Sequence, residues 1–571
     1  MWNASDWRRD PAPAFSSAED GGITLSAPGR PVTSSDRSVS GVTPTTSVDD
    51  AAPAESLQQA HRAHDWATVV RVVERHWMSL MHQNFVETRA ALQEVPVPIV
   101  ADSIAAVAIR DFFLLRWRAG DDLLLDLART SRLSDPHWVK ALPIPRWNTS
   151  VSDAAAVMIA LRTRGEMSLA QRYAESIDEV LNAWLTCAGV PGQGFPPDEL
   201  SIMRHVGITR MFAGDHSGAV QTLRRAFRFS PRAAGDPAGP DAATLTAIAY
   251  GLLGEAVEAE EWLARGHDKS TELGPPGTLR TLRALAGALL AIEQGRQTQA
   301  RRSLAQLESR IPGEFVWETA YVYARARYDL VWGDRRRQLR QLADERARLP
   351  RWLQADSTMG PHIDAIEAEL LIAIGNGTEA QRLVAASEHP RLLVPRARLA
   401  MLSGRHDEVV RLATIGLTNA ALNARDQTQL QTLKAVAQER LGDTPAARRS
   451  LTDAINSADV SGARLGLAMA PRTELCKLGA AEGLTYRLET LLSGLPEVFP
   501  ASVDIVTLTT REREVLHQLA DGRTIRDIAD SSYLSQNTIK SQLRSLYRKL
   551  GATSRERVIA LAHEHHLIDR S

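Results

Sequence analysis

The chain has 571 residues and carries 67 Lys and Arg against 68 Asp and Glu, a formal net charge of −1. Its 44% hydrophobic and 24% charged content is that of an ordinary globular protein, and the length predicts roughly three or four domains. Two cysteines, Cys187 and Cys476, exclude a disulfide framework and a cysteine-rich zinc site.

Residues 1–55 are rich in Ser, Thr, Pro, Asp and Gly and hold few large apolar residues. Because so little apolar surface cannot offset the entropy cost of ordering, we expect a disordered leader there. No apolar stretch typical of a signal peptide is present, and no run of residues approaches the length of a membrane span. We therefore expect a cytoplasmic protein that has no membrane partner.

The region 56–500 shows helical periodicity, with apolar residues recurring at three- and four-residue spacing in segments such as 69–81 and 219–229. Strand signals are nearly absent. A longer period overlies the helices, because a Gly follows helical segments at steps of 40, 41, 38 and 42 residues, and a small residue opens the helix after several of these turns. The glycines are Gly214, Gly254, Gly295, Gly333 and Gly375, and the small residues after the first three are Ala219, Ala259 and Ala300.

This spacing is typical of helix pairs closed by a Gly cap. Repeats of this length build α-solenoids of the tetratricopeptide or HEAT kind. We predict an all-α protein in which 56–500 form a tetratricopeptide-like helical-repeat region that acts as sensor or scaffold. The exact repeat class and its boundaries stay open.

The region 506–571 predicts a separate module of four capped helices. The second and third helices, joined by a turn at 532–534, form a helix-turn-helix. The third helix, 536–550, has an apolar stripe on one face, and between Ser535 and Gly551 it carries four cations and no acid. The expected N-caps in chain order are Thr509 or Thr510, Thr524, Ser535 and Ser554.

A basic polar face on a helix of this length fits the major groove of DNA. A solvated face on an ordinary bundle helix is the alternative, and the caps and the helix length favour the DNA-binding interpretation. Lys540 and Arg544 lie one turn apart, so both can enter the groove from one face. Arg binds guanine O6 and N7 with two hydrogen bonds, and Lys reaches the same acceptors as a point charge.

Residues 508–568 resemble the C-terminal DNA-binding domain of LuxR-type (GerE-type) transcriptional regulators. The matching motifs are L-T-x-R-E-x-E-V-L at 508–516, Ala-x-Gly at 520–522, I-A at 528–529, L-S-x-N-T-I-K at 534–540, and Leu546 with K-L-G at 549–551. One departure is Arg526-Asp527, where the family often has Lys-Glu. The resemblance implies that Lys540, Ser541 and Arg544 face the bases. The residues that we expect to face the DNA backbone are Thr524, Arg526, Asn537, Thr538, Arg548 and Lys549.

The middle of the chain resembles more weakly the helical-repeat region of MalT-like LuxR regulators, in the segments 63–81 and 455–479. Those regulators carry an ATPase at the N-terminus. No Gly-Lys dipeptide occurs in this sequence, so it has no phosphate-binding loop of the G-x-x-x-x-G-K-[ST] kind. We expect a regulator that lacks the ATPase.

The predicted function is that of a bacterial, sequence-specific DNA-binding transcriptional regulator, without enzymatic activity, cofactor or metal. The expected partners are double-stranded DNA, a ligand or protein on the solenoid, RNA polymerase as a candidate, and a second copy of the chain on DNA. The alternative is a helical-repeat interaction scaffold with a degenerate helix-turn-helix. A sigma-factor-like protein is less favoured, because the repeats offer no promoter-melting region. The effector, the operator and the sign of regulation stay open.

Overall fold

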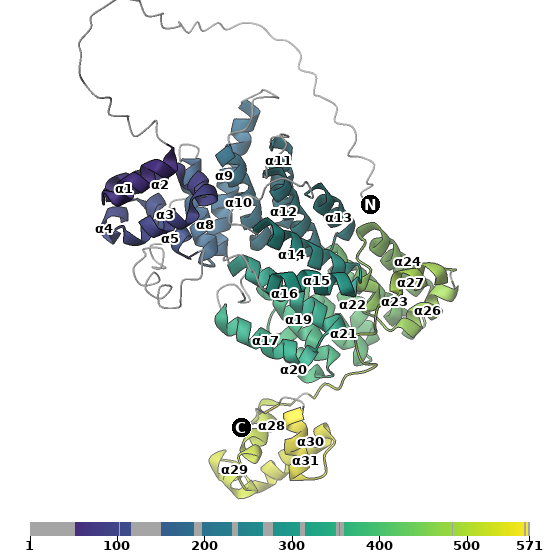
Figure 1. Cartoon of the computed structure of the whole chain (residues 1–571). Coiled ribbons are helices and arrows are strands. Elements are labelled where there is room, and N and C mark those ends of the chain that lie inside the picture. Colours follow the sequence, from purple (N-terminus) through teal and green to yellow (C-terminus); the bar gives the residue numbers. More distant parts are fainter. Residues whose placement is uncertain are drawn as a thin grey trace, which may run out of the picture. The chain divides into compact units, whose positions relative to one another are not determined.

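Every regular element of the described residues is a helix in the computed structural model, which confirms the predicted all-α fold class (Figure 1). Helix α1 (Pro53–Arg62) begins inside the segment expected to be a disordered leader, and residues 1–51 of that segment lie outside the described residues. The structure describes residues 52–101, 103–115, 150–187, 197–230, 238–266, 278–308, 315–349, 353, 359–481, 483–506, 508–564 and 567–568.

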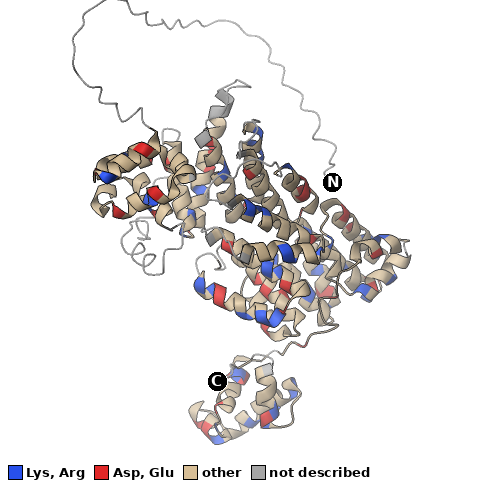
Figure 2. Cartoon of the chain, in the orientation of Figure 1, with Lys and Arg blue, Asp and Glu red and all other residues tan. Residues whose placement is uncertain are grey.

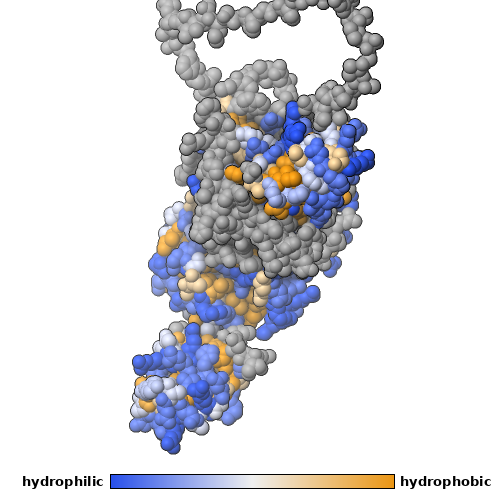
Figure 3. All heavy atoms as spheres, turned by 90° about the vertical axis from the view of Figure 1, so that its left-hand side faces the viewer, coloured by the Kyte–Doolittle hydropathy of each residue, from blue (hydrophilic) through white to orange (hydrophobic). Residues whose placement is uncertain are grey.

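The first helices pack around a core of their own, to which α8, α9 and α10 also contribute. Trp77, Phe112 and Phe113 are each at most 1% exposed, and their rings meet edge to face. Figure 3 views this side of the molecule and shows hydrophobic residues gathered in a patch among hydrophilic ones. The further helices of this part are α2 (Trp66–Gln83), α3 (Phe85–Glu94), α4 (Val97–Val100) and α5 (Ile104–Leu115).

The following helices form consecutive pairs, and the first helix of each pair also contacts the first helix of the next. Such neighbour-to-neighbour packing is expected of a helical-repeat array. The pairs are α8 (Val151–Thr163) with α9 (Met167–Cys187), α10 (Pro197–Ala213) with α11 (His216–Phe229), α12 (Ala238–Leu253) with α13 (Ala256–Arg265), α14 (Thr278–Glu293) with α15 (Gln297–Glu308), α16 (Phe315–Trp332) with α17 (Arg335–Arg348), α19 (Gly360–Ala373) with α20 (Gly377–Ala385), α21 (Leu393–Leu402) with α22 (His406–Leu417), and α23 (Ala424–Arg440) with α24 (Thr444–Ser461). A short 3-10 helix, η3 (Pro390–Leu392), precedes α21.

The turns inside these pairs explain the glycine period. Gly214, Gly254, Gly295 and Gly375 have φ values of 94°, 74°, 69° and 84°, a left-handed conformation that side chains with a Cβ rarely adopt. Gly333 belongs to the same series but does not adopt this conformation. The helix that follows it, α17, has Asp334 as its N-cap. The alanines that follow the turns, Ala219, Ala259 and Ala300, are at most 2% exposed, so they allow the paired helices to approach closely. The tetratricopeptide-like repeat class stays a prediction.

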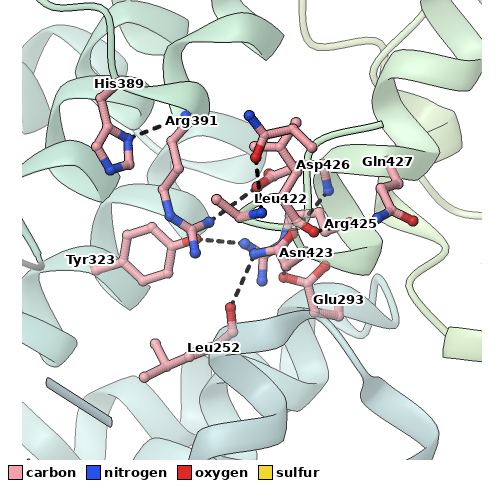
Figure 4. A network of polar contacts seen from close by, with 12 residues as sticks. Leu252, Glu293, Tyr323, His389, Arg391, Leu422, Asn423, Arg425, Asp426 and Gln427 are labelled. Carbon is pink, nitrogen blue, oxygen red and sulfur yellow. Dashed lines mark hydrogen bonds and ion pairs between the residues drawn. The ribbon is translucent and has the colours of Figure 1, made fainter. Parts of the chain in front are cut away.

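Pairs far apart in the sequence also meet. Arg425, in the first turn of α23, is 1% exposed and donates from Nε to Glu293 Oε1 at 2.7 Å and from Nη1 to Tyr323 Oη at 2.6 Å. Glu293 ends α14 and Tyr323 lies in α16. The beginning of α23 is therefore held against helices more than 100 residues earlier, in the network that Figure 4 shows.

A linker segment, residues 499–506, connects the helical region to the last four helices. Its residues Val503 and Ile505 pack with α19, α20 and α21. The backbone N–H of Val503 donates to Leu402 O at 3.2 Å, and that of Val506 donates to Thr378 Oγ1 at 2.9 Å. The helices before the segment are α25 (Leu465–Ala468), α26 (Arg472–Ala481) and α27 (Thr485–Leu492), and those after it are α28 (Thr510–Ala520), α29 (Ile525–Ser531), α30 (Gln536–Leu550) and α31 (Arg555–Glu564).

Charged residues of both signs are interspersed along the helical pairs (Figure 2). Within the described ranges, no helix combines the length and the apolar character needed to cross a bilayer.

Candidate nucleic-acid interface

The last four helices have a separate apolar core, and their starts are fixed by side-chain caps. Thr509 and Glu512 form a reciprocal capping box at α28, and Thr524 and Asp527 form another at α29. A cap of this kind contributes about 1 kcal/mol, because it satisfies backbone N–H groups that have no partner inside the helix. Of the two candidates for the first cap, the structure selects Thr509; the expected caps Ser535 and Ser554 also accept backbone hydrogen bonds, from Thr538 and Arg557.

The turn between α29 and α30 makes the helix-turn-helix. Tyr533 has a φ of 54° and its side chain is 96% exposed, so the turn places a left-handed residue at the surface. Directly after it, the N–H of Leu534 donates to Ala529 O at 3.0 Å and ends α29. Ile528 and Ala529 are buried against α30, which fixes the angle between the two helices.

Helix α30 buries the predicted stripe. Ile539, Leu543, Leu546 and Leu550 are at most 8% exposed, and Tyr547 is half-buried beside them. Gly551 ends the helix in a left-handed conformation with a φ of 63°. Because one face is committed to the core, the opposite face must point to solvent.

The solvent face of α30 carries most of the residues predicted to contact DNA. Lys540, Ser541 and Arg544 are exposed, as are Asn537 and Arg548. In the part of the chain that the structure describes, none of the three cations Lys540, Arg544 and Arg548 forms an ion pair. Their N–H donors are therefore available to an external acceptor.

Four other predicted residues have partners within the domain. The hydroxyl of Thr538, which is half-buried, lies 2.9 Å from Ser535 Oγ, and the hydroxyl of Thr524 donates to Asp527 Oδ2 at 2.7 Å. Arg526 is exposed, with a long contact of 4.0 Å to Asp530. Lys549 Nζ donates to Glu512 Oε2 at 2.6 Å and so ties α30 to α28. These contacts give each side chain a structural role and leave its predicted DNA contact untested.

Glu512 is the residue of this domain that the sequence reasoning missed. It is 3% exposed. Burial alone would raise the pKa of this carboxyl, but hydrogen bonds from Lys549, Thr509 and Ser545 lower it to about 2. The T-x-x-E spacing at 509–512 could have indicated the capping box, whereas nothing in the sequence pairs Glu512 with a lysine 37 residues later.

Residues 506–562 match the family described as "Bacterial regulatory proteins, luxR family". The match covers the three helices α28, α29 and α30 and nearly all of α31. This domain belongs to the LuxR family. The predicted resemblance is thereby confirmed for the LuxR domain, and the likeness of the helical-repeat region to MalT-like regulators stays a prediction.

The curated relatives are named as transcriptional regulators. The chain is 35% identical over 102 residues to the transcriptional regulatory protein NarL of Mycobacterium tuberculosis, a match that covers 17% of this chain and 47% of NarL. It is 40% identical over 88 residues to the virulence factors transcription regulator BvgA of Bordetella pertussis, covering 15% of this chain and 42% of BvgA. The chain thus spans less than half the length of these relatives.

One solved structure, that of Naa15/Naa10 bound to HypK, aligns with 88% of this chain and with 76% of its own matched chain, at 12% identity. The TM-score of 0.19 is too low to assign a fold.

Proposed function

We propose that the chain is a sequence-specific DNA-binding transcriptional regulator. The observation that carries the proposal is the exposed, unpaired pair of cations Lys540 and Arg544 on the outer face of α30, in a domain of the LuxR family. A helix with its apolar stripe on the domain and donors on the other face fits the major groove, where guanine presents two acceptors. Ser541 lies between the two cations and is the third residue proposed to face the bases.

The proposed backbone contacts set the register of α30 on the duplex and carry no sequence information. Arg548 and Asn537 have the exposure that such contacts need.

Because one small domain offers few contacts, we propose that two copies of the chain bind half-sites about one helical turn apart. RNA polymerase is a candidate partner, and the helical-repeat region is proposed to sense a ligand or a protein.

The test is operator binding by the full-length chain, with the operator selected from genomic fragments and affinity measured by fluorescence anisotropy. Arg544→Ala and Lys540→Ala are each expected to weaken specific binding by about 1–3 kcal/mol, the value of a good base contact. Arg557→Ala is the matched control, because it removes an exposed cation from α31 of the same domain. We expect the control to change specific binding by less than about 1 kcal/mol.

Unchanged affinity in both recognition-helix variants would refute the assignment of Lys540 and Arg544 to the bases. Absence of DNA binding by the wild-type chain at low salt, where phosphate contacts are strongest, would refute the function. In that case the interaction scaffold with a degenerate helix-turn-helix is the correct interpretation.

A further inference from the structure

A cavity of about 440 Å³ lies in the helical-repeat region, where residues from distant pairs come together. This volume falls in the range of small-molecule sites, roughly 300–1,000 Å³. The lining comes from the turn before α11, the end of α12, the start of α19, η3 and the turn before α23. The polar side chains in it are Asp215, His216, Ser217, His362, His389, Arg391 and Asn423.

Three long helices begin at this cavity. His216 is the first residue of α11, Pro361 and His362 lie in the first turn of α19, and Asn423 is the N-cap of α23. The N-terminus of a helix carries a partial positive charge of about half a unit, and three of them converging on one cavity favour an anion there.

His216 is buried without satisfying either of its nitrogens. The residue is 7% exposed, and among the described residues neither Nδ1 nor Nε2 has a hydrogen-bond partner. Burial and the nearby Arg391 guanidinium lower the pKa of His216 to about 4, so the ring is neutral at pH 7. Both nitrogens are closed off from the cavity as well as unpaired, so His216 lines the wall without presenting a hydrogen-bonding atom to a ligand.

Arg391 and His389 supply the donors (Figure 4). In the described part of the chain, the Arg391 guanidinium has a single hydrogen-bond partner, Asp426 Oδ2 at 3.1 Å, which leaves most of its five N–H groups free. His389 Nδ1 accepts the backbone N–H of Arg391 at 3.2 Å, so the neutral ring carries its proton on Nε2. Burial, reinforced by Arg391, lowers the pKa of His389 and keeps the ring neutral.

The three carboxylates nearby are already occupied. Asp215 accepts the N–H of Gly218 at 2.8 Å and lies 3.7 Å from Arg210, Asp426 pairs with Arg391, and Asp364, which faces His389, pairs with Arg346. The groups left for a ligand are therefore mainly donors, and an acceptor-rich molecule fits them best.

We propose that this cavity binds a small organic oxyanion, a molecule with a carboxylate or phosphate group held by Arg391 and His389 where the three helix starts converge. Binding does not depend on the proposed function, whereas a role of the anion as effector rests on it. The proposal thus gives the sensed ligand a chemical class.

The test uses the full-length chain without DNA, so that its failure is separate from a failure of DNA binding. Inorganic phosphate, succinate and citrate are titrated by calorimetry and by thermal shift, against sodium chloride of equal ionic strength and against neutral glucose. At least one anion is expected to bind and to raise the Tm, since a ligand that binds the folded state stabilises it. Binding of phosphate alone identifies a phosphate group, and binding of succinate or citrate alone identifies a carboxylate.

Two variants locate the site while preserving the fold. His389→Asn keeps a side-chain acceptor for the Arg391 N–H but removes the Nε2–H donor, and Arg391→Lys keeps the charge opposite Asp426 but loses the planar fork. Each is expected to weaken anion binding by about tenfold or more, equivalent to one good charge-assisted hydrogen bond. The matched controls, His406→Asn at the start of α22 and Arg396→Lys in α21, alter residues that do not line the cavity and are expected to leave affinity unchanged.

The proposal is overturned if none of the three anions stabilises the chain more than sodium chloride does, or if only glucose binds. It is equally overturned if His389→Asn and Arg391→Lys bind the anion as tightly as the two controls.

Discussion

At the scale of single residues, the Lys549–Glu512 ion pair, at 2.6 Å, is shorter than the 4.0 Å contact between Arg526 and Asp530 in the same LuxR domain. Because the pKa of Glu512 is lowered from 4.5 to about 2, its contribution to stability is present above pH 4.5 and is lost as the pH falls toward 2. Glu512→Gln keeps a capping-box residue but removes the charge. We expect it to destabilise α28 by about 1–3 kcal/mol at pH 7 and to abolish the pH dependence. Hydrogen exchange of α28 and α30 peptides in the full-length chain measures both effects.

Asp527→Asn is the control for this prediction, because Asp527 forms the second capping box and no lysine of the described residues pairs with it. Equal protection of α28 in wild type and Glu512→Gln at pH 7 would contradict it. The cap at Thr509 was predictable from local sequence, whereas the pairing with Lys549 depends on how α30 crosses α28. Local patterns carry no information on such a contact.

Two arginines on the solvent face of α30 are expected to differ in kind. Arg544 is proposed to face the bases. We therefore expect Arg544→Ala to reduce the ratio of operator affinity to mismatched-site affinity. Arg548 is proposed to face the DNA backbone. We therefore expect Arg548→Ala to weaken the affinity for every DNA sequence by a similar factor. The slope of log affinity against log salt concentration is expected to fall by about 1. Anisotropy titrations at several salt concentrations on both DNA sequences distinguish the two. Identical behaviour of the two variants would show that the backbone and base assignments are wrong.

At the scale of elements, the glycine turns between paired helices differ in what surrounds them. Gly404 has a φ of 75° and a Cβ there would meet nothing within 4 Å, whereas at Gly254, with a φ of 74°, it would lie 2.8 Å from Arg425 Cβ. Gly404→Ala is therefore expected to cost only the left-handed strain, about 1–2 kcal/mol. Gly254→Ala is expected to cost more, since it also displaces Arg425 from Glu293. Urea denaturation measures both, and an equal loss in the two variants would contradict this reasoning.

The glycine period was predictable because a left-handed cap is a local requirement of the chain. The helix bounds of the LuxR domain were predictable for the same reason, since Thr509, Ser535 and Gly551 each act within one turn of their own helix. Gly333 shows the limit of this pattern. It occupies a position in the glycine repeat, but its backbone does not adopt the left-handed conformation of the other four glycines.

The linker segment is a second element whose contacts can be tested singly. A Cβ at Gly377, near the start of α20, would lie 2.8 Å from Asp504 O and 3.2 Å from Val503 Cβ. Gly377→Ala is therefore expected to displace the segment and to speed hydrogen exchange of the Val503 and Val506 amides by about tenfold. Gly287→Ala, inside α14, is the control, because its Cβ would meet one flexible hydroxyl, Ser303 Oγ at 3.3 Å. Unaltered exchange in Gly377→Ala would mean that the segment is not held by this contact.

At the scale of the whole molecule, the cavity residues were out of reach of sequence reasoning. His216, His389 and Asn423 lie in different helix pairs, and they meet because Arg425 holds the start of α23 against α14 and α16. Whether distant pairs meet depends on the rotation between successive helix pairs, added up along the array. No local sequence pattern specifies that total. The sequence could predict that a helical array exists, but it could not predict which turns of the array come together.

A chain of contacts leads from the cavity to the linker segment. A small second cavity shares Arg391 and His362 with the first and is also lined by Glu369 and Gln429. Arg398, which is 1% exposed, donates to Glu369 at 3.2 Å and to Gln429 at 2.5 Å, and its guanidinium lies 4.0 Å from the centre of the Phe499 ring. Phe499 begins the linker segment. A ligand that alters the Arg398 contacts can therefore alter how this segment packs on the helical-repeat region, and the segment leads directly to the LuxR domain.

This geometry predicts that Phe499 couples ligand binding to DNA binding. Phe499→Leu keeps an apolar side chain but removes the ring under Arg398, and Phe499→Tyr, which keeps the ring, is the control. We expect Phe499→Leu to bind the anion and the operator separately within about twofold of wild type, while the change in operator affinity caused by the anion shrinks toward none. Anisotropy titrations with and without the anion measure this ratio, and calorimetry with and without operator must give the same factor, because coupling free energies are reciprocal. A coupling factor equal to that of wild type would show that the signal passes elsewhere, since spatial adjacency alone does not establish a pathway.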